Sequence, residues 1–347
     1  MYSDLLLKEC DCAIITSPAS LYYVSGVDVA DAVLILTKRG NYYLTNSLYE
    51  VAVKAASPSG FELLIQTREE QSAFIKNQVE NAAVIGLEYD HITLAWFNSF
   101  FTKQDKTVDI TGTLAELRKI KSCEEREIIK QAESIVDAAF QATLPLIKPG
   151  ISEKALRDAL VANLIANGAE RTAFDTIVAF GENAAMPHAV PSERVLREGD
   201  CVLMDFGAKY KGYCSDFTRT VHCGKPSQKF CEAYQTVLTA QRNAIEYLEK
   251  GGRSAFEADK IARETIDRSP FRGTFTHTLG HGVGIEIHEA PWLSRRSKDV
   301  LCDNEVFTIE PGVYLEGEFG VRIESLVMIE NGKLTVIDRS DKEIYIV

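Results

Sequence analysis

Apolar and polar positions alternate on two different periods in the first third of the chain. Short apolar runs bounded by turn residues predict strands, and they lie at 13–16, 32–37, 42–44, 61–65 and 83–87. Segments 49–56 and 69–81 have the apolar spacing of helices. Strands that alternate with helices predict an α/β domain with helices on the faces of a mixed sheet, which we place at residues 1–116.

Residues 117–347 begin with two helices and continue with short strands, and this order then repeats. Ser122 and Glu125 have the spacing of a capping box, so a helix is expected to begin beside them and to reach about residue 146. The elements expected after it are a helix at 152–166, strands at 176–180, 201–206 and 213–221, helices at 227–249 and 255–267, and a strand-rich end at 306–347. Two helix pairs, each followed by strands, predict an α+β domain with an internal duplication.

The charge balance of the chain limits its partners. Its 347 residues include 38 Lys and Arg against 50 Asp and Glu, a formal net charge of −12. That charge argues against binding to nucleic acid or to anionic lipid, because both need a basic surface. No apolar run reaches the ~20 residues of a membrane span, and no signal peptide is visible. Eight cysteines without a Cys-x-x-Cys pair fit free thiols in a reducing compartment, so the sequence predicts a cytoplasmic protein.

Two aspartates lie on either side of a predicted hairpin turn. Asp205 ends an apolar strand and Asp216 lies in the next strand, with the turn at 209–212 between them. Residues equidistant from an antiparallel turn face each other, so the two carboxylates are expected side by side, within one residue of register. Facing like charges destabilise a hairpin unless a cation lies between them.

Two glutamates repeat this arrangement near the end of the chain. Glu310 follows strand 307–309 and Glu324 follows strand 321–323, with a turn at 316–318 between them. The hairpin therefore predicts a second pair of facing carboxylates. Each of these acidic residues is next to apolar strand residues rather than within a run of charges, which favours a buried site over a solvated surface.

Three histidines lie within a short glycine-rich stretch, His277, His281 and His288. Gly280 and Gly282 flank His281, so backbone can approach closely and the imidazole is unobstructed. Four buried carboxylates carry a charge that two divalent cations would balance. Oxygen ligands with one nitrogen suit Mn, Co, Fe or Zn, and two such ions can hold a hydroxide and polarise a carbonyl. The pattern therefore predicts a hydrolase with two metal ions.

The ordered set of these residues resembles the metal signature of the pita-bread metallopeptidases, in the branch of aminopeptidase P and prolidase. The motifs that carry the resemblance are Met204-Asp205-Phe206-Gly207, Ser215-Asp216-Phe217-Thr218-Arg219-Thr220, Gly280-His281-Gly282-Val283-Gly284, Ile309-Glu310-Pro311-Gly312 and Val321-Arg322-Ile323-Glu324. The resemblance covers the chain from about Arg118 to its end, and Tyr22-Tyr23-Val24-Ser25-Gly26 extends it weakly to the first domain. It implies a creatinase-like N-terminal domain at 1–116 and a pita-bread catalytic domain at 117–347.

The resemblance also implies the roles of the five ligands. Asp216 and Glu324 are expected to bridge two ions, Asp205 to bind one of them, and His281 with Glu310 to bind the other. Glu310 is in addition expected to shuttle the proton of the water between the ions. Manganese is the expected metal, with cobalt, zinc and iron as alternatives. Relatives of this kind are usually dimers, so a homodimer is expected.

Four further residues are expected around the ligands by the same resemblance. His188 resembles the family's histidine outside the ligand set and is expected to bind the substrate. His277 and His288 resemble those that contact the substrate and the tetrahedral intermediate. Arg322 resembles the arginine beside the metal carboxylates, whose charge would restrain the geometry of the site. The two remaining histidines, His91 and His222, are interpreted as structural.

The activity expected from the resemblance is that of an Xaa-Pro aminopeptidase, which cleaves peptides with proline at the second position by means of a hydroxide that bridges the two metals. A bond before proline is a tertiary amide without an N–H, so activation of its carbonyl by a metal suits it. The alternatives are an Xaa-Pro dipeptidase and an inactive binding relative. Trp292 stands where many family dipeptidases have arginine, which argues against a strict dipeptidase unless Arg295 or Arg296 takes over that role. All five retained ligands argue against an inactive protein. Methionine aminopeptidases usually have arginine where Ile285 stands, so methionine aminopeptidase activity is disfavoured. In the first domain, Asn46-Ser47-Leu48-Tyr49 departs from the pattern of relatives.

Overall fold

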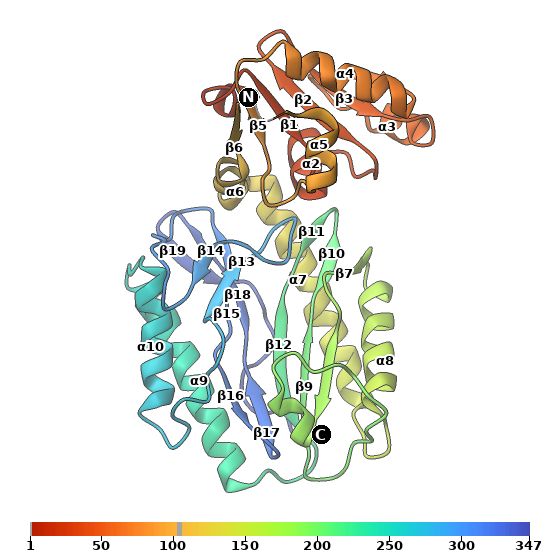
Figure 1. Ribbon diagram of the computed structural model, residues 1–347. Helices are drawn as coiled ribbons and strands as arrows, with labels where there is room; N and C mark the ends of the chain where they lie inside the picture. Colours follow the sequence, from red (N-terminus) through yellow and green to blue (C-terminus); the bar gives the residue numbers. More distant parts are fainter. Residues whose placement is uncertain (1, 103–105) are drawn as a thin grey trace. The chain divides into compact units, whose positions relative to one another are not determined.

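The chain divides into two compact units, one ending at Arg118 and the other beginning at Lys119 (Figure 1). The structure, a computed structural model, describes residues 2–102 and 106–347. Each unit has its own hydrophobic core, with two clusters of buried residues in each. The chemistry predicted from the sequence falls in the second unit, so the first is described briefly.

The first unit is a mixed six-stranded sheet with the strand order β4-β3-β2-β1-β5-β6. Its strands are β1 (Cys12–Ile15), β2 (Val33–Thr37), β3 (Gly40–Thr45), β4 (Glu62–Ile65), β5 (Ile85–Leu87) and β6 (Thr107–Asp109). Its helices are α1 (Tyr2–Leu6), α2 (Pro18–Ser25), α3 (Glu50–Ala56), α4 (Arg68–Glu80), α5 (Leu94–Phe100) and α6 (Thr111–Lys119). Alternate residues of β1 pack into different cores, Ala13 and Ile15 into one and Cys12 and Ile14 into the other. Both faces of the sheet are therefore covered, as the apolar runs predict.

The sequence predictions for this unit hold for β1 to β5 and for helices α3 and α4. They missed α2, although Ser17 accepts a hydrogen bond from the Ser20 amide and Pro18 occupies the first turn, two signals of a helix start. They also missed α5 and the three-residue strand β6, because short elements carry too little periodicity to be recognised.

The first half of the second unit packs two helices on short sheets. The helices are α7 (Cys123–Thr143) and α8 (Glu153–Ala166), followed by the strands β7 (Arg171–Thr172), β8 (Ile177–Phe180), β9 (Cys201–Phe206), β10 (Ala208–Tyr210), β11 (Tyr213–Cys214) and β12 (Phe217–His222). The strand orders are β12-β9-β8 and β11-β10-β7. The predicted capping box is present, because the Ser122 hydroxyl accepts from the Glu125 amide and the Glu125 carboxylate accepts from the Ser122 amide.

The second half repeats this plan. Helices α9 (Gln228–Glu249) and α10 (Ala255–Asp267) precede β13 (Gly280–Gly282), β14 (Glu289–Leu293), β15 (Val306–Ile309), β16 (Gly312–Leu315), β17 (Phe319–Arg322), β18 (Ser325–Glu330) and β19 (Lys333–Val336). The larger sheet has the order β14-β13-β15-β18-β19, and β16 pairs with β17. Figure 1 shows α7 with α8 on one side of the strands of this unit and α9 with α10 on the other. The predicted α+β architecture with two helix pairs is confirmed.

The two hairpins that carry the acidic residues change sheets part-way along their length. Strands β9 and β12 pair in one sheet, whereas their continuations β10 and β11 pair in another. In the same way, β15 and β18 belong to the five-stranded sheet and β16 and β17 form a separate ribbon. Backbone pairing stops at each junction, and Asp216, Glu310 and Glu324 all lie there, outside the strands. The junctions thus place acidic residues between the sheets.

The predicted register is right for the second hairpin and wrong for the first. Gly312 pairs with Arg322 around a turn at 316–318, as expected. Asp205, however, pairs with Thr218 and not with a residue beside Asp216. The turn is tighter than predicted, because Tyr210 pairs with Tyr213 and the two residues between them, Lys211 and Gly212, have φ of 46° and 76°. Asp216 is therefore a diagonal neighbour of Asp205 rather than its direct partner.

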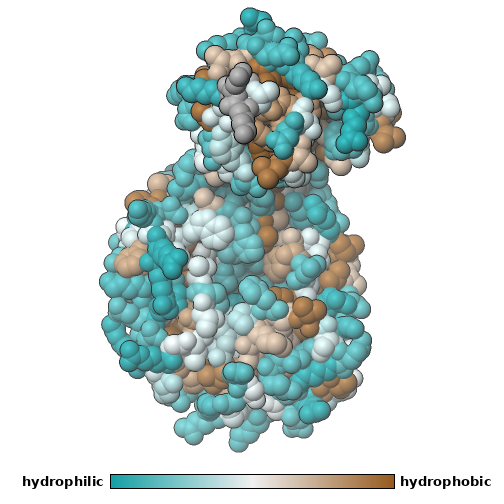
Figure 2. Space-filling model, in the orientation of Figure 1, coloured by the Kyte–Doolittle hydropathy of each residue, from teal (hydrophilic) through white to brown (hydrophobic). Residues whose placement is uncertain are grey.

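The character of the helices and of the surface can be compared with the sequence prediction of no membrane span. In the parts of the chain that the structure describes, no helix combines the length and the apolar character that crossing a bilayer requires. Figure 2 shows a mainly hydrophilic face on this unit, with apolar residues in small groups. All eight cysteines are free thiols, as the sequence predicts, and Cys123 and Cys302 are exposed.

Candidate active site and metal centre

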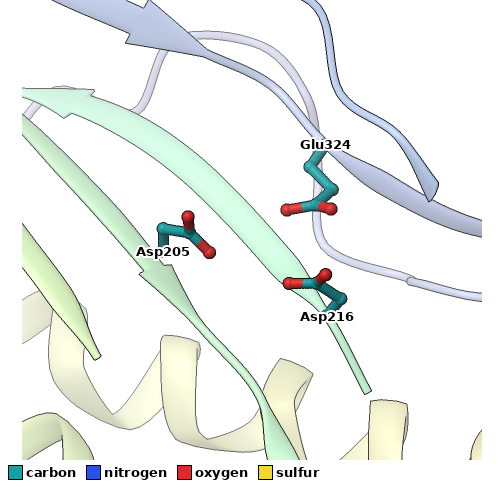
Figure 3. A group of neighbouring side chains, drawn as sticks. All are labelled: Asp205, Asp216 and Glu324. Carbon is teal, nitrogen blue, oxygen red and sulfur yellow. The ribbon is translucent and has the colours of Figure 1, made fainter. Parts of the chain in front are cut away.

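Three carboxylates from the two hairpins converge on one point. One ligand atom each of Asp205, Asp216 and Glu324 lies within 4.8 Å of the other two. Figure 3 shows their side chains directed toward one another from β9, from the segment just before β12 and from the loop before β18. The diagonal placement of Asp216 therefore still brings its carboxylate to Asp205, so the error in register does not remove the cluster.

His281 and Glu310 complete this group. His281 Nε2 lies 3.4 Å from Asp216 Oδ2 and 3.4 Å from Glu310 Oε1. Its other nitrogen, Nδ1, is 3.0 Å from the carbonyl oxygen of Gly282, so Nδ1 carries the proton and Nε2 has the lone pair. A lone pair that faces two carboxylates is repelled unless a cation lies between them. All five predicted ligands are therefore gathered, with the imidazole tautomer that a metal ligand needs.

The pKa values of these side chains show that negative charge is unfavourable in the buried cluster. Burial, and after it the charges of Glu324 and Asp205, raise the pKa of Asp216 well above its ordinary value. Burial, with the charges of Glu310 and Asp205, does the same to the pKa of Glu324. Burial raises the pKa of Glu310 to about 8 and lowers the pKa of His281 to about 4. Asp205 Oδ1 is buried and has no hydrogen-bond partner among the residues that the structure describes. These carboxylate and imidazole groups fit divalent cations, which would coordinate the unpartnered oxygen of Asp205 and offset the repulsion between the carboxylates.

Two threonines hold the carboxylates in place. The Thr218 hydroxyl donates to Glu324 Oε2 at 2.8 Å, and the Thr308 hydroxyl donates to Glu310 Oε1 at 3.2 Å. Thr308 also accepts from the His281 amide at 3.1 Å. Such hydrogen bonds fix the direction in which the remaining carboxylate oxygens point, which limits the geometry of any bound ion.

An arginine, a tyrosine and a histidine form a chain beside the carboxylates. Arg322 Nη2 donates to Asp205 Oδ2 and Arg322 Nη1 donates to the Tyr314 oxygen at 2.7 Å. The Tyr314 hydroxyl lies 2.8 Å from His277 Nε2, and His277 Nδ1 lies 2.9 Å from the Thr278 carbonyl oxygen. Because a carbonyl can only accept, Nδ1 is protonated and Nε2 accepts from Tyr314. Both ring nitrogens of His277 are thus engaged with the protein.

Tyr314 is not among the site residues predicted from the sequence. A signal for it exists, because alternate residues of a strand share one face, and Tyr314 follows Glu310 and Gly312 at even spacing. Gly312 pairs with Arg322, so this face of the hairpin also carries the arginine. A tyrosine in a hairpin is nevertheless an ordinary core residue, and only the contact with Arg322 distinguishes it.

A single cavity of about 1030 Å³ contains the gathered residues. The five predicted ligands, His188, His277, His288 and Arg322 all line it, together with Trp292 and residues of α8. His188 and His288 are exposed, so their rings can meet a molecule in the cavity. The His288 ring lies 4.3 Å from the His281 ring and nearly parallel to Trp292, at 19°. His91 and His222 are not among the residues that line this cavity.

Comparison with known proteins identifies the family. Residues 127–331 match the model of metallopeptidase family M24, and residues 5–120 match the creatinase/prolidase N-terminal domain. The chain belongs to metallopeptidase family M24. This M24 peptidase is therefore a hydrolase whose family uses divalent metal ions, and its second unit has the pita-bread fold, so the family resemblance is confirmed.

Relatives of this M24 peptidase are similar over its whole length. An Xaa-Pro dipeptidase of Pyrococcus furiosus is 37% identical over 336 residues, which covers 95% of this chain and 94% of the relative. Among solved structures, the Xaa-Pro dipeptidase from Bacillus anthracis has a TM-score of 0.94 with 35% identity, covering 100% of this chain and 99% of that one. The X-Pro aminopeptidase from Thermotoga maritima has a TM-score of 0.90 with 34% identity and covers 100% of both chains.

Proposed function

We propose that this M24 peptidase hydrolyses the bond between an amino-acid residue and a following proline, and that Xaa-Pro dipeptides are its substrates. The observation that carries the proposal is its similarity, over the whole length, to proteins named Xaa-Pro dipeptidase. The sequence alone favoured the aminopeptidase on the strength of Trp292. The relative named Xaa-Pro dipeptidase reaches 37% identity over nearly the whole length, against 34% for the X-Pro aminopeptidase, and we give this more weight than one substituted position.

We propose two divalent ions in the centre, with Asp216 and Glu324 shared between them. Asp205 would hold one ion, and His281 with Glu310 would hold the other. Four carboxylates in a buried cluster support two ions over one, since a single divalent ion would leave half of their charge unbalanced. Manganese is the proposed metal, with cobalt, zinc and iron as alternatives for the same donors. When bound, such ions make water acidic and polarise a carbonyl group.

Glu310 is proposed to move the proton that hydrolysis requires. Its pKa of about 8 reflects burial, and a bound cation would lower that value toward the range in which a carboxyl group both takes and returns a proton near neutral pH. Glu310 can therefore accept a proton from water and deliver it to the departing proline nitrogen. That delivery is necessary because a secondary amine leaves poorly without a proton.

Among the histidines, we propose that His188 and His288 contact the substrate. Both are exposed in the cavity, whereas the nitrogens of His277 are occupied by Thr278 and Tyr314. Burial lowers the pKa of His277 to about 3, so its ring is neutral. His277 would then act by orienting Tyr314, and through it Arg322, against Asp205. This differs from the direct substrate contact that the family resemblance implies for His277.

An aminopeptidase that accepts longer peptides is the second candidate. The solved X-Pro aminopeptidase from Thermotoga maritima is nearly as similar to this chain as the Xaa-Pro dipeptidase from Bacillus anthracis. The cavity of about 1030 Å³ has room for more than a dipeptide, and Trp292 in its wall offers an apolar surface instead of a cation for a terminal carboxylate. These features would suit a peptide that continues beyond proline.

A series of peptides of increasing length separates the two candidates. The purified protein, loaded in turn with manganese, cobalt, zinc or iron, is assayed on Ala-Pro, Ala-Pro-Ala and Ala-Pro-Ala-Ala, with Ala-Ala as the control for proline dependence. Cleavage restricted to Ala-Pro supports the dipeptidase. Equal or faster cleavage of the longer peptides supports the aminopeptidase, and no cleavage of any proline peptide with any metal refutes both.

Homodimer formation and a cytoplasmic location stay predictions. Sedimentation of the purified protein would test the first, and fractionation of cells that produce it would test the second.

A further inference from the structure

A buried ion pair on helix α10 lies behind the histidine-bearing segment of the site. Arg263 Nη2 and Nε donate to the two oxygens of Asp259, at 2.8 and 3.0 Å. The side chains are 9% and 0% exposed, and neither residue lines the cavity. A buried pair is costly to desolvate and contributes little net stability by itself, so its other contacts are informative.

Those contacts go to the backbone that carries His277. Arg263 Nη1 donates to the Phe275 carbonyl at 2.7 Å, and Nη2 donates to the His277 carbonyl at 2.8 Å. The guanidinium also lies 4.1 Å from the centre of the Phe275 ring, whose edge meets the His277 ring at 5.0 Å. Arginine has five N–H donors in one rigid plane, so it can bind a carboxylate and two backbone carbonyls at once. Lysine lacks this planar arrangement of donors and could not do so.

Asp259 holds the next peptide unit. The Leu279 amide lies 3.1 Å from Asp259 Oδ1 and shares its proton with the Leu293 carbonyl at 2.9 Å. In a planar trans peptide the N–H and the C=O point in opposite directions. The Thr278 carbonyl and the Leu279 N–H belong to the same peptide unit. Because the hydrogen bond to Asp259 holds the Leu279 N–H toward α10, the Thr278 carbonyl points away from α10 and toward His277 Nδ1, which lies 2.9 Å from its oxygen.

We propose that Asp259 and Arg263 are positioning residues that set the tautomer of His277. Arg263 fixes the peptide unit after His277, Asp259 fixes the following one, and the Thr278 carbonyl then accepts the proton of Nδ1. His277 Nε2 then accepts a hydrogen bond from the Tyr314 hydroxyl, and the Tyr314 oxygen accepts a hydrogen bond from Arg322. The same segment continues to Leu279, whose carbonyl accepts from the Glu310 amide at 2.8 Å, and to His281. The effect on turnover rests on the proposed function, whereas the tautomer does not.

The tautomer is measured directly by NMR. The full-length protein is labelled with ¹⁵N histidine and loaded with diamagnetic zinc, and correlations between ring protons and nitrogens distinguish protonated from unprotonated nitrogens. His277→Gln identifies the His277 signals by their loss. The unaltered protein is expected to carry the proton on Nδ1, and Asp259→Leu is expected to give a mixture of tautomers. Asp259→Asn, which keeps an oxygen for the Leu279 amide, is expected to restore Nδ1. An unchanged tautomer in Asp259→Leu overturns the proposal.

Kinetics on Ala-Pro give the second readout. Arg263→Met is expected to lower kcat by about 10- to 100-fold, the range typical of groups that orient site residues, with KM and metal content little changed. Arg263→Lys is not expected to rescue kcat. The matched control is Arg268→Met, which removes the exposed i,i+4 pair with Glu264 at the end of the same helix and is expected to leave kcat and the tautomer unaltered.

Folding is separated from positioning by a double variant. If Asp259→Leu does not fold, Asp259→Leu with Arg263→Met replaces both charges by apolar groups, a change that buried pairs often tolerate. A folded double variant with the tautomer and kcat of the unaltered protein overturns the proposal. If no variant or wild-type protein cleaves a proline peptide, the proposed function fails, but the NMR result still decides the tautomer.

Discussion

Glu133 is a fully buried acid whose pKa is raised by its surroundings, and its titration should be visible in the stability of the protein. It lies on α7 with 0% of its surface exposed. Both of its carboxylate oxygens are buried without a hydrogen-bond partner among residues 2–102 and 106–347. Burial, and then the charges of Asp338 and Asp137, raise its pKa well above the ordinary value of 4.5. The folded protein therefore keeps Glu133 protonated at a pH at which the unfolded chain has released that proton.

The sign of the effect follows from this difference. A group whose pKa is raised by folding contributes its full stability below the pKa of the unfolded state, 4.5, and loses it as the pH rises. Between the two pKa values the loss is about 1.4 kcal/mol for each pH unit. Glu133→Gln cannot titrate, so it should match the unaltered protein near pH 4.5 and become more stable than it by about 1.4 kcal/mol per unit above that pH, until the pKa of the folded state is reached.

Urea unfolding at pH 5, 6 and 7 measures this difference. The protein is loaded with the same metal throughout, and its metal content is checked in each variant. Glu127→Gln on the same helix is the control, because Glu127 is 64% exposed in its side chain and should change stability little at any pH. Parallel stability curves for Glu133→Gln and the unaltered protein would show that Glu133 is not held in its neutral form, which would refute the reasoning.

Three further outcomes test the site. Asp216→Ala and Glu324→Ala should each abolish both activity and metal binding, since each carboxylate is proposed to serve two ions; two ions per chain by elemental analysis in either variant would contradict this. His288→Ala should retain both ions but lower kcat about 100-fold if His288 contacts the reacting group, and a near-normal kcat would exclude that role. Tyr314→Phe should lower kcat about 10-fold with normal metal content, because it breaks the link between Arg322 and His277; unchanged kinetics would make that link irrelevant to turnover.

The elements that the sequence predicts well are those with local signals at both ends. Helix α10 begins after Ser254, whose hydroxyl accepts from the Glu257 amide, and it occupies the predicted residues 255–267. The hairpin around Gly317 was found with the correct register, because glycine at that position adopts a φ of 73°. In such places the residue that fixes the backbone is itself visible in the sequence.

The predictions failed where an unusual conformation was adopted by an ordinary residue. Lys211 has a φ of 46°, which lysine rarely adopts, and this shifted the first hairpin by two residues. Asp259, Arg263 and Glu133 look like common helical charges, because periodicity alone does not separate a buried acid from an exposed one. A signal existed for Glu133, which follows Ile129 by four residues and precedes Phe140 within the apolar stripe of α7.

The five predicted ligands nevertheless converge, and the change of sheets explains why they tolerate such errors. Within a strand the pleat fixes which side a residue faces, so a shift of register by one residue would turn a ligand away. Asp216, Glu310 and Glu324 lie at junctions where backbone pairing between the strands stops. At the first of these junctions the chains pass so close that a Cβ on Gly207 would lie 2.0 Å from the Ser215 carbonyl oxygen. Freed from the pleat, these side chains can turn into the space between the sheets. There, burial raises the pKa values of all three carboxyl groups, so a cation bound between them would favour their ionised form. We therefore expect metal binding and the ionisation of these carboxyl groups to occur together.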